Sequence, residues 1–281
     1  EETTGLDLVR LQLQVAAGQP LEGEMPAENG HAVEARLNAE DADNEFAAAP
    51  GTVKLLDLPL GPGIRVDTGI GQGDVIPPDF DSMVAKIIAW GPDRDSALAR
   101  LRTALQETTV VIEGGTTTKS FLLDLLDREE VITASADTGW LDRTGAGTGT
   151  SLSDKADIAL LTAAAEVYEA EEALERQRFL AAAYGGRPRA DHTVGRPVEL
   201  AHQGQPYAFT VKKTGPHRYR VIGDQGETQV DVERLGEYER RVVTGKGTSL
   251  VVAVEGTGGH LIEVDGVSHR ITRDEAGLVR T

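Results

Sequence analysis

The sequence predicts an α+β protein of two domains: an antiparallel sheet with helices, then an eight-stranded antiparallel β-barrel around a long α-helix. Three features predict this fold. In the first half, short runs of alternating apolar and polar residues lie between Gly- and Pro-rich turns. From Asp154 to Tyr184, apolar residues recur at helical spacing without interruption. Beyond that helix the apolar period shortens to two, over short, evenly spaced runs separated by turn residues.

The composition limits the classes of protein to which the chain can belong. A length of 281 residues favours about two domains, and 40% hydrophobic residues suffice for packed cores. The net charge of −18 argues against a nucleic-acid partner, because phosphate contacts need clustered Lys and Arg; solubility is its simplest explanation. The chain has no cysteine, no export signal and no run of ~18 apolar residues, so we expect a cytoplasmic protein without disulfides or membrane contact.

The first domain is predicted over residues 1–145 and begins with a helix. Thr4 or Asp7 is a suitable N-cap, and Gly18-Gln19-Pro20 ends the helix. Turn residues separate the strands and helices expected next. These are strands at 31–37, 52–58, 63–68 and 83–90, a helix from Asp93 or Asp95 to about Thr108, a strand at 109–113 and a short helix at 120–127. The Gly/Ser/Thr-rich residues 146–153 are predicted to be an interdomain linker.

The second domain is predicted over residues 154–281, with a helix at 154–184 and a barrel at 192–281. Apolar residues occupy so wide an arc of the helix that we expect other elements to surround it. Asp265-Gly266 favours a tight β-hairpin. The eight predicted strands are 197–202, 206–213, 217–223, 226–233, 237–244, 248–255, 259–265 and 267–273.

Four stretches of the first domain carry a family resemblance. They are GHAVEARLNAEDADNEF at 30–46, the following APG, GPGIRVDTG at 61–69 and VIPPDFDSMVAKIIAWG at 75–91. Together they resemble the C-terminal lobe of the biotin carboxylase component of biotin-dependent acyl-CoA carboxylases. The helix and barrel that follow resemble, in order and length, the BT domain that bridges the biotin carboxylase and carboxyltransferase parts. This order is similar to propionyl-CoA and methylcrotonyl-CoA carboxylase α subunits and to single-chain bacterial long-chain acyl-CoA carboxylases.

The resemblance implies a ligase of fatty acid metabolism, of which this chain is a fragment. The parent would carboxylate carrier-linked biotin with ATP, Mg²⁺ and bicarbonate, and then an acetyl-, propionyl- or long-chain acyl-CoA. The ATP-grasp lobe and the metal-binding glutamates are expected upstream of Glu1, and the biotinyl carrier is expected outside this chain. Carboxyltransferase and carrier domains are the expected partners, in a homo-oligomer. We expect the fragment alone to be inactive.

The resemblance assigns a catalytic role to Arg36. The predicted strand has Val33, Ala35 and Leu37 on its apolar face, and Arg36 projects from the other. In biotin carboxylases the Arg of this strand faces the ureido group of biotin and bicarbonate. A guanidinium suits a developing oxyanion because it stays charged and presents paired donors. The alternative is an edge strand whose Arg pairs with a neighbouring carboxylate.

Further positions follow from the same resemblance. Phe80 and Asp81, in PPDFDSM, are expected at the active-site rim as biotin-binding residues, and Arg65, in GPGIRVDTG, at the homodimer interface. An Arg–Asp pair between adjacent loops is the structural alternative. Phe179 and Tyr184 continue the apolar pattern of the long helix beyond the part that a barrel covers, so we expect them at the carboxyltransferase interface.

No metal site is predicted in the chain itself. The six histidines show no paired ligand spacing, and no cysteine completes a zinc site. Residues 114–120 mimic a phosphate-binding loop, but Thr118 stands where the glycine before the lysine is required. A different class remains open, namely a non-catalytic interaction module that holds two enzymes together. For residues 150–281 taken alone, that is the preferred interpretation.

Overall fold

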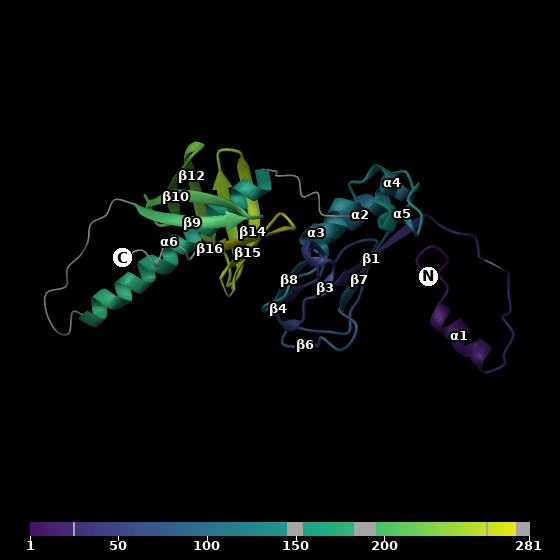
Figure 1. The fold of residues 1–281 in the computed structure, drawn as a ribbon. Helices are drawn as coiled ribbons and strands as arrows, with labels where there is room; N and C mark the ends of the chain where they lie inside the picture. The colour runs from purple at the N-terminus through teal and green to yellow at the C-terminus, as the bar shows by residue number, and fades with distance from the viewer. Residues whose placement is uncertain (25, 145–153, 183–194, 257, 274–281) are drawn as a thin grey trace. The chain divides into compact units, whose positions relative to one another are not determined.

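The computed structural model describes residues 1–24, 26–144, 154–182, 195–256 and 258–273. The chain divides into two compact units, Glu1–Gly149 and Thr150–Thr281. Figure 1 shows the elements of each unit. Among the described residues, no helix has both the length and the apolar character needed to cross a membrane.

The first unit combines small antiparallel sheets with helices. β7 is the central strand of a three-stranded sheet in the order β1-β7-β5, and a second sheet has the order β6-β4-β8. The elements are α1 (Leu8–Ala16), β1 (His31–Asn38), β2 (Glu40–Asp41), η1 (Ala42–Asn44), β3 (Ala47–Ala48), β4 (Gly51–Asp57), β5 (Ile64–Asp67), β6 (Val75–Ile76), β7 (Met83–Gly91), α2 (Arg94–Glu107), β8 (Thr109–Ile112), α3 (Lys119–Leu125), α4 (Glu129–Ile132) and α5 (Trp140–Thr144).

One face of the β1-β7-β5 sheet is buried. Ala35 and Ile87 pack against Leu101 and Leu105 of α2. The helix begins where the sequence predicts, because the Asp93 carboxylate accepts a hydrogen bond from the backbone N–H of Ser96 at 2.8 Å. With this face covered, the opposite face of the sheet presents its side chains outward.

The first helix uses the second of the two N-caps that the sequence offers. α1 starts at Leu8, and its N-cap is Asp7, whose side chain accepts a hydrogen bond from the backbone N–H of Arg10 at 2.9 Å. Thr4 instead accepts a hydrogen bond from the backbone N–H of Leu6 at 3.3 Å, outside the helix. No residue of α1 is buried, so local capping and not packing fixes its start.

The second unit is a closed antiparallel barrel around a helix, which confirms the predicted fold. Each strand pairs with the next, and β16 returns to β9, where Ile271 lies opposite His202. The elements are α6 (Asp154–Ala182), β9 (Arg196–His202), β10 (Gln205–Lys213), β11 (Arg218–Gly223), β12 (Gly226–Arg234), β13 (Glu239–Thr244), β14 (Gly247–Gly256), β15 (Gly259–Val264) and β16 (Val267–Arg273).

The first half of α6 forms the centre of the barrel. Ala159, Ala163 and Ala164 are buried there with Leu160 and Val167, among the inward-facing residues of the strands. The alanines let the strands approach the helix closely, which is why a barrel of eight strands can enclose it. Figure 1 shows the second half of α6 extending beyond the strands.

Candidate functional site

Arg36 lies on β1, at the edge of the sheet whose other face packs on α2. Ala35 and Leu37, its neighbours in the strand, are buried. In the register of the sheet, Arg36 is opposite Lys86 of β7, and Lys86 is opposite Asp67 of β5. Glu34 and Arg65 lie in the adjacent row, on either side of Ile88. We call Glu34, Arg36, Arg65, Asp67 and Lys86 the charged sheet face.

The guanidinium of Arg36 is only partly engaged. Its Nε donates to Glu34 Oε1 at 3.0 Å, and its side chain is 65% exposed. Within the described part of the chain, this glutamate is its one ion-pair partner. Among the described residues, no hydrogen bond engages its two terminal amino groups. Arg36 therefore pairs with a neighbouring carboxylate, as the structural alternative predicts, and still has N–H donors available for a substrate, as a catalytic role requires.

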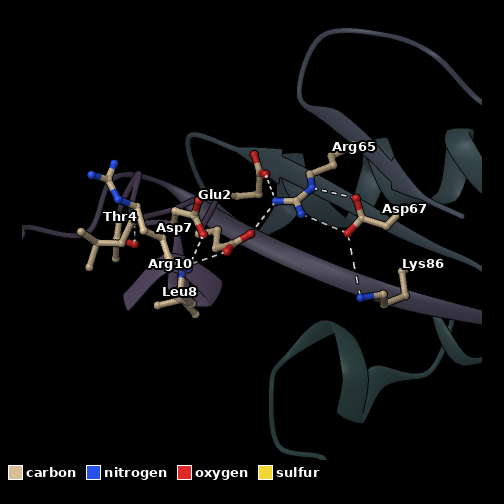
Figure 2. A network of polar contacts seen from close by, with 10 residues as sticks. Glu2, Thr4, Asp7, Leu8, Arg10, Arg65, Asp67 and Lys86 are labelled. Atoms are coloured by element: carbon tan, nitrogen blue, oxygen red, sulfur yellow. Dashed lines mark hydrogen bonds and ion pairs between the residues drawn. The ribbon is translucent and has the colours of Figure 1, made fainter. Parts of the chain in front are cut away.

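Arg65 has a different environment, shown in Figure 2. Its Nε and Nη2 donate to the two carboxylate oxygens of Asp67 at 3.0 and 3.1 Å. Its Nη1 donates to Glu1 at 2.7 Å and to Glu2 at 3.2 Å. Its hydrogen bonds to these carboxylates raise the pKa of Arg65, and the one to Glu1 lowers the pKa of that carboxyl group. Arg65 thus ties the N-terminal residues to β5.

The predicted Arg–Asp alternative needs a different partner from the one expected. The aspartate that Arg65 binds is Asp67, two residues on in the same strand, and the two side chains share a face. Asp81 instead accepts a hydrogen bond from the backbone N–H of Met83 at 3.0 Å and so closes the turn that enters β7. Phe80 is exposed in that turn. Phe80 and Asp81 therefore lie at the end of β7 where Met83 pairs with Asn38.

The expected interface residues of the long helix are only partly described. Phe179 lies on α6, with its side chain exposed, and Leu174 and Leu180 are exposed as well. Tyr184 lies outside the described residues, as does the predicted linker at 146–153.

Sequence reasoning missed Asp67 and Lys86. Lys86 is 3.9 Å from Asp67 across the sheet, and both belong to the charged sheet face. The spacing of Arg65 and Asp67 gave a usable signal, because residues two apart in a strand share a face. No signal in the sequence indicated that Lys86 lies near Arg36. Their proximity depends on the pairing of β1 with β7, and other strands are nearer to β1 in sequence.

The described residues contain no group of three or more His, Cys, Asp or Glu side chains that could hold a metal ion. The stretch that mimics a phosphate-binding loop is structural. Lys119 is buried, and its Nζ donates to the backbone carbonyl of Thr108 at 2.6 Å. That ammonium therefore supports the chain between α2 and β8 instead of facing a phosphate.

Comparison with known proteins finds relatives of the first unit. A family model described as the biotin carboxylase C-terminal domain matches residues 34–143. The α3 subunit of a biotin-dependent acyl-coenzyme A carboxylase from Mycobacterium leprae is 50% identical over 111 residues, which are 39% of this chain and 19% of that protein.

Two further relatives extend the match. Biotin carboxylase 1 of Bacillus subtilis is 42% identical over 144 residues, or 50% of this chain and 32% of that protein. The mitochondrial methylcrotonoyl-CoA carboxylase subunit alpha of Rattus norvegicus is 43% identical over 135 residues, or 46% of this chain and 18% of that protein. The chain thus spans between about a fifth and a third of the length of these relatives. Residues 34–143 are thus similar to the C-terminal domain of biotin carboxylases.

Proposed function

We propose that this chain is part of a biotin-dependent acyl-CoA carboxylase and that its first unit supplies Arg36 to the biotin carboxylase active site. The parent enzyme carboxylates biotin on a carrier domain with ATP and bicarbonate, and the carboxyl group then passes to an acetyl-, propionyl- or long-chain acyl-CoA. The identity with carboxylases of two acyl-CoA classes supports the general reaction.

The observation that carries this proposal is the state of Arg36. Its strand is fixed by buried neighbours on both sides, and its side chain is largely exposed. When biotin is bound, Arg36 would donate N–H groups to its ureido oxygen and would stabilise the negative charge that develops there, while a base from another part of the parent takes the N1′ proton. Glu34 orients the guanidinium through Nε.

The other cofactors need residues from elsewhere in the parent. Because the described residues form no metal cluster, we assign none of them to Mg²⁺ and derive no step through it. The proposal places ATP and Mg²⁺ on a part of the parent outside the matched segment, so the 281 residues by themselves are expected to lack biotin-dependent ATP hydrolysis. Phe80 and Asp81 are proposed to contact biotin from the rim of the site.

The second unit is proposed to act as a BT domain that joins the biotin carboxylase and carboxyltransferase parts. A purely non-catalytic interaction role fits this unit, because its barrel is filled by its own helix while α6 continues outside it with exposed Leu174, Phe179 and Leu180. Arg65 is proposed to lie at the homodimer contact of the parent.

The test is Arg36→Ala in the complete enzyme. We expect the rate of biotin carboxylation to fall by ~100- to 1,000-fold, because one oxyanion donor is removed. The matched control is Arg241→Ala, which removes a half-exposed strand arginine paired with Glu233 in the barrel and should leave the rate unchanged. A rate for Arg36→Ala within about threefold of wild type would assign this residue a structural role only.

A further inference from the structure

One end of the barrel contains a cavity of about 410 Å³. It lies between the first turns of α6, the start of β10 and the end of β11, and the turn before β14 completes it. Cavities of this size are typical of small-molecule sites, and the mouth of a β-barrel is one of their usual places. The carboxylase chemistry proposed above uses none of its residues.

The first wall of this barrel-end cavity is aromatic. Tyr207 and Phe209 alternate on β10 and share its inner face, with ring planes 12° apart and centroids 6.3 Å apart. Phe209 lies against Gly223 of β11, where an added Cβ would come within 3.0 Å of the ring. The absence of a side chain at Gly223 therefore makes room for the ring of Phe209, and the two aromatic rings lie nearly parallel.

The second wall is aliphatic and comes from α6. Ile158 and Leu161 line the cavity, and both are only partly buried although they pack on the barrel core. Two aromatic rings beside an aliphatic wall suit a planar ligand, because a rigid ring contacts both with little loss of conformational entropy.

The polar groups of the cavity select against anions. Its lining contains two carboxylates, Asp157 and Asp224, and one ammonium, that of Lys246. Lys246 Nζ lies 3.3 Å from Asp157 Oδ2, so its charge is already compensated. The hydroxyls of Thr228 and Thr244 also line the cavity and supply hydrogen-bonding groups without charge.

We propose that this cavity binds an uncharged planar heteroaromatic ring. The ring plane lies along Tyr207 and Phe209, its other side meets Ile158 and Leu161, and its hydrogen-bonding edge meets the threonine hydroxyls. This binding site is independent of the proposed carboxylase function and of the exposed part of α6.

The test uses the whole 281-residue chain and indole as the probe. Indole is titrated while the backbone amide resonances are followed by NMR. We expect saturable shifts at 158–161 and 207–209 with a Kd of about 1 mM or tighter. Intermolecular NOEs should connect indole protons with the rings of Tyr207 and Phe209. Indole-3-acetate, which adds one negative charge, should bind at least about fivefold more weakly.

Two neighbouring variants locate the site. Thr228 lies in the cavity lining, whereas the next residue of β12, Gln229, points to the other face of the strand. Thr228→Trp should fill the cavity and weaken indole binding at least about tenfold, and Gln229→Trp should bind as wild type does.

Some outcomes overturn the proposal. Absence of saturation by about 10 mM indole, or NOEs to other residues, removes the site. Tighter binding of indole-3-acetate than of indole removes the proposed ligand class. Because the NOEs are measured on the wild-type chain, the result stands even if Thr228→Trp does not fold.

Discussion

Arg36 and Arg240 are both strand arginines paired with a glutamate, but they differ in exposure and in the number of hydrogen bonds they donate. The side chain of Arg240 is 6% exposed, and its Nε donates to Glu166 of α6 at 2.6 Å. Its Nη1 donates to the backbone carbonyls of residues 236, 237 and 239 at 3.1 to 3.3 Å. Arg36 contacts one carboxylate and is mostly exposed.

The difference lies in where the donors point. The N–H donors of Arg240 bind acceptors within the barrel unit, where they hold α6 against β13, so this guanidinium is not available to a substrate. Among the described residues, only the Nε of Arg36 is hydrogen-bonded, so the strand positions a guanidinium whose terminal amino groups can still donate. A strand arginine is therefore informative about function only together with the number of donors that the fold already occupies.

The largest expected effect on stability follows directly. Arg240→Ala should lower the free energy of unfolding of the second unit by about 3–5 kcal/mol, because Glu166 and three carbonyl groups lose their donor. Arg36→Ala should change that of the first unit by less than ~0.5 kcal/mol. Urea unfolding measures both, since the two Trp residues lie in the first unit and the five Tyr residues in the second.

Arg241→Ala is the control in the barrel, because Arg241 follows Arg240 in the same strand but is half exposed. A loss for Arg36→Ala as large as that for Arg240→Ala would end the contrast between the two arginines.

A second expected difference is sensitivity to acid. His269 is buried in the barrel beside His202, with ring centroids 5.4 Å apart. Burial lowers the pKa of His269 to about 4, and the charges of His202 and Lys155 act in the same direction. Burial also lowers the pKa of His260.

Because the folded-state pKa of His269 lies below its unfolded value, the unfolded chain binds more protons in acid. Its contribution to stability is present above about pH 6.5 and falls by about 3 kcal/mol by pH 4. Thermal unfolding followed by Tyr absorbance between these pH values should show this loss, and His269→Gln should reduce it. His217→Gln changes an exposed histidine and is the control. An acid limb that is the same in His269→Gln would contradict this assignment.

The two units also differ in what the sequence could predict. The barrel follows from periodicity: the alanine-rich arc of α6 and the alternation of the strands define inside and outside locally, and observed strand ends differ from expected ones by no more than two residues. The order β1-β7-β5 does not follow in that way, because β2 to β6 lie between β1 and β7 along the chain. The row of Arg36 and Lys86 is therefore a product of topology.

Contacts between distant segments limited the site prediction further. Arg65 and its partner Glu1 are 64 positions apart, and nothing local signals their ion pair. The barrel-end cavity depends in the same way on Phe209 meeting Gly223 across two strands. Family resemblance placed Arg36 on its strand, but the number of its occupied donors needed coordinates.

The end of α6 is the part of the second unit that resembles Arg36 in being presented outward. The double change Phe179→Ala with Tyr184→Ala should weaken association with the proposed carboxyltransferase partner about tenfold, because Phe179 is exposed and aromatic anchors dominate interface energies. The melting temperature of the chain should stay nearly constant. Leu250→Ala, which removes an exposed aliphatic side chain of β14, is the control. A collapsed melting temperature with intact association would place these residues in a core.

Arg65 lies between the two extremes, since three carboxylates engage it while its side chain stays 40% exposed. In the complete protein, Arg65→Ala should weaken self-association two- to fivefold, about the worth of one exposed ion pair. The same change should speed hydrogen exchange at the amide of Leu8, which donates to Glu1 at 3.0 Å, because Glu1 loses its tie to β5. Arg102→Ala, which breaks a surface pair with Asp127, controls for the loss of charge. Sedimentation velocity measures self-association and so distinguishes an interface role from an intrachain one. Faster exchange at Leu8 with unchanged self-association would mean that Arg65 only holds the N-terminal residues to β5, with its hydrogen bonds made within the chain as those of Arg240 are.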